Sequence, residues 1–324
     1  MAENSNSRTA YPDVTKVAAP LLLGPLFNWT LYGVLCVQMY VYSYNFPKDR
    51  RSIKFLAYFV FLLDTAQTAL TGADIYYWFV EGFGDVERLK RSHFSPIDSP
   101  ITTTVISFIV QGYFCYRIWL LNKRSLWICL IIAISAVTQV VAAIWLGTTS
   151  LIAGKYVVTK AGVYLWSIPS ALADILIAVA MTLLLRVASS NFSSFVLIRV
   201  VRLTIETNTL TASLAITILV LYAAFPVSRA EIDYEPPSDL ITFFPGTKVI
   251  GKVYSNTLLV SLNNRIYFRE HLLPEHGDSP HPMISDRVRA TALSSLHFAV
   301  PEPRPRTPTI DNYSVPPTGE PRQQ

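Results

Sequence analysis

The residues best suited to do chemistry in this sequence are ionisable side chains that lie inside long apolar segments. Lys252, Ser255 and Asn256 lie within one otherwise apolar segment of membrane length, and Asp64 and Asp174 lie within two others. A charged side chain at the centre of a bilayer costs about 3 kcal/mol on insertion scales, so such residues pair with one another or face a polar cavity. We therefore predict that Lys252 bonds to Asp64 or to Asp174 inside a helical bundle.

A small and polar stripe on another apolar segment adds Asn208 to this prediction, because Thr204, Asn208, Thr211 and Ala215 share one helix face. The predicted intramembrane polar cluster comprises Asp64, Asp174, Asn208, Lys252, Ser255 and Asn256. Two interpretations stay open. The cluster could be a polar knot that only stabilises the fold, or it could line a ligand pocket or pathway, or act as a switch whose protonation changes helix packing.

Other motifs point to no reaction. Residues 82–85 read Gly-Phe-Gly-Asp, the spelling of an intramembrane aspartyl protease, but they lie in a predicted loop where turn glycines explain them. A lysine on a seventh segment is typical of retinal proteins, yet its wider surroundings do not match. Residues 115–117 read Cys-Tyr-Arg where the largest receptor class has Asp-Arg-Tyr. The sequence therefore predicts no catalytic residue, no cofactor, no metal site and no enzyme.

The elements that must position the polar cluster are membrane helices. The 324 residues are 51% hydrophobic and only 15% charged, whereas an average soluble domain is about 25% charged. About 20 apolar residues span a bilayer as a helix. Seven segments have this length, and we predict an all-α polytopic membrane protein with seven transmembrane helices over 18–44, 54–79, 101–121, 126–147, 162–185, 203–225 and 240–262.

Basic residues predict the orientation and the domains. The first connector contains Lys48, Arg50, Arg51 and Lys54, the strongest cytoplasmic-loop signal. The N-terminus is then outside and the C-terminus inside, and the mixed-charge loop 80–100 is outside and exposed. We predict a polar tail over 1–17, a transmembrane domain over 18–265 and a proline-rich, disordered cytoplasmic tail over 266–324. The net charge of +5 has no clustered face, which argues against nucleic acid as a partner.

Six sequence blocks carry a family resemblance. They occur in the order LFNWTLYGVLCVQMYVYSYNFPKDRRSIK, LLDTAQTAL, VQGYFCYRIWLLNK, ALADILIAVAMTLLLR, ETNTLTA and KVYSNTLLVSLNNR. Together they resemble an uncharacterised multi-pass membrane family of mushroom-forming basidiomycete fungi, with a domain of unknown function at about 162–265. The resemblance implies seven helices and no known activity. It also implies candidate motif residues at the inner helix ends, Arg117, Asn263 and Arg265.

We expect a receptor-like or sensor-like protein for a small or lipidic ligand. The odd number of segments disfavours a doubled transporter, most segments carry a polar stripe, and the tail suits phosphorylation or docking of a cytoplasmic partner. A transporter or channel for a small solute is the alternative, and a purely structural membrane protein is the third. The expected partners are the lipid bilayer, a small-molecule or lipid ligand and a partner of the tail, with the plasma membrane favoured as the location.

Overall fold

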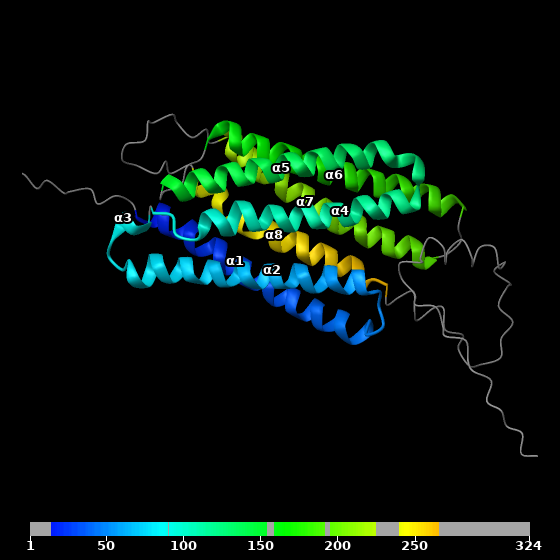
Figure 1. Cartoon of the computed structure of the whole chain (residues 1–324), viewed down its shortest axis with the longest axis horizontal. Coiled ribbons are helices and arrows are strands. Elements are labelled where there is room, and N and C mark those ends of the chain that lie inside the picture. The colour runs from blue at the N-terminus through cyan, green and yellow to red at the C-terminus, as the bar shows by residue number, and fades with distance from the viewer. Residues whose placement is uncertain (1–13, 90, 154–158, 192–194, 225–239, 266–324) are drawn as a thin grey trace, which may run out of the picture.

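The fold consists of long helices lying roughly alongside one another (Figure 1). The computed structural model describes residues 14–89, 91–153, 159–191, 195–224 and 240–265, and these residues contain no β-strand. The long helices are α1 (Val14–Asn45), α2 (Arg51–Ile75), α4 (Thr103–Leu121), α5 (Leu126–Ala153), α6 (Lys160–Asn191), α7 (Phe195–Ala224) and α8 (Leu240–Asn263). Each of the seven predicted segments therefore contains one long helix, and the all-α prediction is confirmed for the described residues.

Four helical stretches are long and apolar enough to cross a membrane, which indicates a membrane protein. They are Ala18–Asn45, Arg51–Glu81, Lys123–Ala153 and Ala161–Leu184. Their outward faces carry large apolar side chains that no protein group covers, since Leu62, Trp127 and Val141 are 64%, 76% and 63% exposed. Apolar side chains on the outside of a helix bundle are what a lipid environment favours.

Several predicted boundaries were wrong by a few residues. Residues 148–153 were expected in a loop but continue α5. The hydroxyls of Thr148 and Thr149 donate to the backbone carbonyls of Ile144 and Trp145, one turn earlier, so these polar side chains are satisfied within the helix. Helix α1 begins at Val14, four residues before the predicted start. The predicted N-terminal tail up to residue 13 and the proline-rich tail 266–324 lie outside the described residues.

The connection between α2 and α4 is largely helical. It contains the π-helix η1 (Tyr76–Glu81), the short helix α3 (Val86–Leu89) and a second π-helix, η2 (Ile97–Thr102). Gly84 has a φ of 83°, the left-handed region that glycine adopts most readily, so the Gly-Phe-Gly-Asp motif forms a turn. The prediction of an exposed loop was wrong for Asp98, which is fully buried because η2 packs against α2, α4, α5 and α8.

Helix α8 is the centre of the bundle. It packs most extensively against α1 and also contacts α2, α4, α7 and η2, and it runs between the α1–α2 pair and α7 (Figure 1). Every side chain from Thr247 to Asn263 is buried or half-buried. Gly24 allows α1 to approach closely, because a Cβ there would lie 3.2 Å from the Cα of Pro245. Polar side chains on α8 are therefore enclosed by protein rather than by lipid.

Replacing Gly147 by alanine is expected to destabilise the bundle where η2 meets α5. A Cβ at this position would lie 2.7 Å from Ile101 Cδ1 and 2.9 Å from the carbonyl oxygen of Pro96. Overpacking of this kind costs about 1–3 kcal/mol, so the midpoint of thermal unfolding in detergent should fall. Gly112→Ala is the matched control, since a Cβ at Gly112 meets nothing within 4 Å. An unchanged midpoint for Gly147→Ala would contradict this packing.

Candidate functional site

Lys252 of α8 forms a buried ion pair with Asp64 of α2. Its Nζ lies 2.7 Å from Asp64 Oδ1 and also donates to the Asp64 carbonyl oxygen at 2.7 Å. Both side chains are fully buried, and the ring of Tyr32 lies under the ammonium at 5.4 Å. Of the two partners left open by the sequence, the structure therefore places Asp64 against Lys252.

Ser255 and Asn256 follow Lys252 on the same helix, and Asn256 joins α8 to α1. Asn256 Nδ2 donates to the carbonyl oxygens of Leu31, at 3.2 Å, and of Lys252, at 2.7 Å. Ser255 is fully buried. The α8 part of the predicted cluster is thus a contiguous polar stretch that faces α1 and α2.

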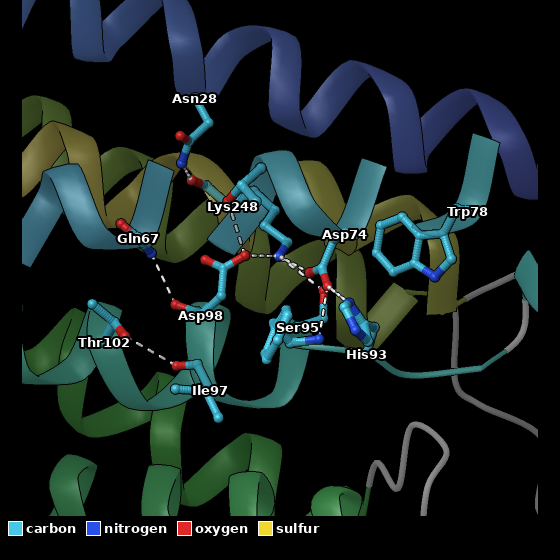
Figure 2. Close-up of polar contacts among 12 residues, drawn as sticks. Asn28, Gln67, Asp74, Trp78, His93, Ser95, Ile97, Asp98, Thr102 and Lys248 are labelled. Atoms are coloured by element: carbon cyan, nitrogen blue, oxygen red, sulfur yellow. Dashed lines mark hydrogen bonds and ion pairs between the residues drawn. The ribbon is translucent and has the colours of Figure 1, made fainter. Parts of the chain in front are cut away.

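A second lysine, Lys248, forms another buried ion-pair group one turn earlier on α8 (Figure 2). Its ammonium donates to Asp98 Oδ2 and, at 2.9 Å, to Ser95 Oγ, and it lies 3.6 Å from Asp74 Oδ2. Lys248, Asp74 and Asp98 are all fully buried. Thr71 Oγ1 donates to the same Asp98 oxygen at 2.9 Å. Two carboxylates therefore share one ammonium.

The segment that precedes η2 is tied to α2 at this group. The backbone N–H of Phe94 donates to Asp74 Oδ1 at 2.7 Å, and His93 Nδ1 lies 3.5 Å from the same oxygen. Gln67 Nε2 donates to the Asp98 carbonyl oxygen at 2.9 Å. The side chain of His93 is 34% exposed, so this histidine forms the edge of an otherwise buried group.

Asp174 of α6 lies in a separate network without a lysine. Tyr254 of α8 donates to Asp174 Oδ2 at 2.7 Å, and Gln111 Nε2 donates to Oδ1 at 3.3 Å. Tyr254 Oη also lies 3.1 Å from Ser170 Oγ, and Gln139 extends the network by donating to Gln111 Oε1 at 3.2 Å. These bonds connect α4, α5, α6 and α8. All the hydrogen bonds that hold the carboxylate come from neutral donors.

Asn208 is buried on α7, but no described hydrogen bond joins its side chain to the Lys252–Asp64 pair or to the Asp174 network. Its backbone carbonyl accepts from Thr211 Oγ1 at 2.8 Å, and its Nδ2 has no hydrogen-bond partner among the described residues. The predicted polar cluster is therefore divided. Asp64, Lys252, Ser255 and Asn256 lie on the α1–α2 side of α8, whereas Asp174 lies on the α4–α6 side.

Tyr254→Phe is expected to lower the free energy of unfolding by about 1–3 kcal/mol, because it leaves a buried carboxylate oxygen of Asp174 without its 2.7 Å donor. Thermal unfolding in detergent measures the loss. Tyr44→Phe is the matched control, since Tyr44 is 76% exposed. Equal midpoints for the two variants would contradict a structural role for the Tyr254 hydroxyl.

The candidate inner-end residues lie together at the C-terminal end of α8. Arg265 pairs with Asp49 of the first connector at 2.5 Å and stacks on the ring of Phe46 at 4.5 Å. Asn263 Nδ2 donates to the Gln38 carbonyl oxygen at 2.9 Å. In addition, Arg117 Nη1 of α4 donates to Ser261 Oγ of α8 at 2.7 Å. The end of α8 is thus fixed to α1, to α4 and to the first connector.

An apolar layer separates the two polar ends of α8. Leu258, Leu259 and Leu262 are at most 1% exposed and belong to one core cluster with Leu35 of α1 and Val60 of α2. Along α8 the three leucines lie between Lys252 and Arg265. Two polar side chains of the same stretch, Thr257 and Ser261, are also buried, and Ser261 is the one that accepts from Arg117.

Sequence reasoning missed Lys248, Asp74 and Asp98. Lys248 lies four residues before Lys252, so both lysines fall on one helix face, and this spacing could have indicated a second buried ammonium. Asp98 lies in a mixed-charge stretch before the apolar part of α4, which gave no sign of burial. The described residues contain no group of three or more His, Cys, Asp or Glu side chains that could hold a metal ion.

The C-terminal part of the helical bundle matches a known family model. Residues 170–267 match DUF6534, a family of unknown function. The chain carries a DUF6534 domain. This domain contains most of α6 and all of α7 and α8, and so includes Asp174, Lys248, Lys252 and Arg265. No curated protein and no solved structure matches the chain.

Proposed function

We propose that the protein is a seven-span integral membrane protein with its N-terminus outside and its C-terminus in the cytoplasm, and that it acts as a receptor or sensor for a small or lipidic ligand. Seven helices of 19 to 32 residues support the span number, and the basic connector between α1 and α2 supports the orientation. On this orientation Lys248 lies in the outer half of α8 and Arg265 at its inner end. The plasma membrane is the favoured location.

One observation carries this proposal: buried leucines that cluster with α1 and α2 lie between the lysine-containing half of α8 and its inner end. A conducting pathway requires polar or wet surroundings through the whole membrane, and the leucines interrupt them where α8 packs with Leu35 of α1 and Val60 of α2. A receptor instead requires a ligand site on the outer side of the membrane and, on the inner side, a contact that changes when the ligand binds. A rigid element must connect the two. Helix α8 joins Lys248 and Lys252 to the Arg265–Asp49 pair in this way.

A ligand of such a receptor would act by favouring one packing of α8 over another, because it shifts an equilibrium only by its difference in affinity for the two states. Changed contacts at Lys248 or Lys252 would alter how α8 lies against α1. Arg265, at the other end of α8, would then change its distance to Asp49 of the first connector. The cytoplasmic tail 266–324, which follows Arg265 directly, would transmit this change to a partner.

The test is a thermal-shift screen of the purified protein against lipids and small polar metabolites. Ligand binding raises stability by RT ln(1 + [L]/Kd), so a specific ligand should raise the midpoint of wild type. We expect the rise to be absent in Lys252→Met and retained in Lys123→Met, where an exposed turn lysine is replaced. A hit that shifts all three proteins equally would contradict a site at α8.

A transporter for a small solute is the alternative, and the Asp174 network supports it because a buried carboxylate held by neutral donors can exchange a proton. Solute flux in proteoliposomes that is lost in Asp174→Asn would favour this alternative over a receptor. A purely structural protein is the third possibility, and it predicts neither ligand shifts nor flux. The orientation has its own test: a glycan on Asn191, at the end of α6, would contradict a cytoplasmic position.

A further inference from the structure

Basic side chains from two separate connections gather at the end of the bundle where α8 ends (Figure 1). Arg265 of α8 pairs with Asp49 of the first connector, and Ser261 of α8 accepts from Arg117 near the end of α4, so both connections lie beside the end of α8. The cations, which we call the basic end, are Lys48, Arg50, Arg51 and Lys54 from the first connector and the start of α2, and Lys123 and Arg124 from the turn between α4 and α5. All of them except the half-buried Lys54 are exposed.

The basic end has almost no carboxylate to balance it. Residues 46–54 and 122–125 contain one acid, Asp49. Its carboxylate is already engaged, because it accepts from Arg265 and, at 3.0 Å, from Tyr42 Oη. At the opposite end of the bundle, residues 81–91 contain as many acids as cations, and Arg88 pairs with Glu81 at 3.6 Å. The excess of positive charge in these connections therefore lies at one end.

Exposed aromatic rings flank the basic end on the outside of the helices. Tyr44 precedes the first connector, Phe55 directly follows Lys54, and Trp127 follows the turn between α4 and α5. The three rings belong to three of the four stretches that are long and apolar enough to cross a membrane. Tyrosine and tryptophan favour the depth at which hydrocarbon meets headgroups, because each joins an apolar ring to a polar group. Rings at this depth put the neighbouring cations at the level of the lipid phosphates.

We propose that the basic end binds the headgroups of anionic phospholipids in the leaflet that it faces. Lysine and arginine donate charge-assisted hydrogen bonds to phosphate oxygens, and each cation close to an anionic membrane surface strengthens binding about fivefold. A lipid also supplies acyl chains that lie against the exposed rings, whereas a soluble polyanion would reach only the cations. This surface lies at the other end of α8 from Lys248, and it does not rest on the receptor function proposed above.

Lipid retention by the full chain tests the proposal. The protein is held in detergent micelles with equal amounts of phosphatidylserine and phosphatidylcholine and is then purified, and its bound lipids are extracted and quantified by mass spectrometry. We expect phosphatidylserine to be retained about fivefold over phosphatidylcholine at low salt, with the preference falling as salt screens the charges. Equal retention of the two lipids would overturn the proposal. Displacement of phosphatidylserine by inorganic phosphate at the same concentration would also overturn it, since the surface would then bind free phosphate.

The double variant Lys48→Gln/Arg51→Gln locates the surface. Both side chains are exposed, so these changes remove two charges and leave the core intact. We expect the preference for phosphatidylserine to fall about fivefold, to near equality. Arg88→Gln/Arg91→Gln is the matched control, because it removes two charges from the opposite end of the bundle, and it should retain the preference. A preference that is unchanged in the first variant, or reduced equally in both, would overturn the assignment to the basic end.

Discussion

Lys252→Met is expected to lower the free energy of unfolding by about 3–5 kcal/mol, because it leaves the carboxylate of Asp64 buried without its ammonium. Methionine keeps all of the lysine side chain's length except its terminal atom, so most of the loss reports the charge rather than the volume. Asp64→Asn in the same chain should restore much of the stability, since the neutral amide no longer requires a counter-charge. Denaturation in detergent, followed by tryptophan fluorescence, gives the four free energies of the double-mutant cycle.

One result of this double-mutant cycle would contradict the ion pair. If the losses of Lys252→Met and Asp64→Asn simply add in the double variant, the two side chains do not interact and the 2.7 Å pair is wrong. Lys123→Met is the control for replacing a lysine by methionine, because Lys123 is exposed in the turn between α4 and α5. This control should change stability by less than about 0.5 kcal/mol.

Lys248→Met is expected to be at least as destabilising as Lys252→Met, because its ammonium serves both Asp98 and Asp74. Here Asp98→Asn should restore only part of the stability, since the carboxylate of Asp74 stays buried and unpaired. The triple variant with Asp74→Asn should recover more. The same unfolding measurement compares the three proteins.

Full rescue by Asp98→Asn alone would show that Asp74 does not depend on Lys248, and that the 3.6 Å contact carries little energy. Asp85→Asn is the matched control, because Asp85 lies in the exposed turn before α3 and bonds only to backbone N–H groups there. In the Lys248→Met background this control should restore nothing.

The helices were predictable because they follow from local composition. Apolar runs of about 20 residues fixed all seven long helices to within a few residues at most ends, as with α4, predicted over 101–121 and found over Thr103–Leu121. The sequence also identified the polar face of α2, where Asp64, Gln67 and Thr71 are buried as their spacing predicts. Periodicity reveals which side of a helix is polar, since it needs no knowledge of neighbours.

The pairing of these faces was less predictable because it depends on the rotation and depth of separate helices. Lys252 had two possible aspartates, and only the packing of α8 against α2 selects Asp64. Asp98 was expected in solvent because charged, proline-rich stretches usually lie outside, yet η2 folds back under α2 and brings this carboxylate to Lys248. The sequence contains both residues, which are 150 positions apart, but it does not show that the fold brings them together.

If α8 spans the membrane as proposed, its two lysines have a consequence for biosynthesis. Lysine at a helix centre costs about 3 kcal/mol on insertion scales, and α8 carries two lysines that point at α2 and η2. On the proposed seven-span topology, α8 is therefore a poor substrate for independent insertion and should enter the membrane only by docking against helices already there. Until then, Asp64 and Asp74 remain without their ammoniums. A chain that ends before residue 240 should consequently be retained and degraded rather than exported as a six-helix protein.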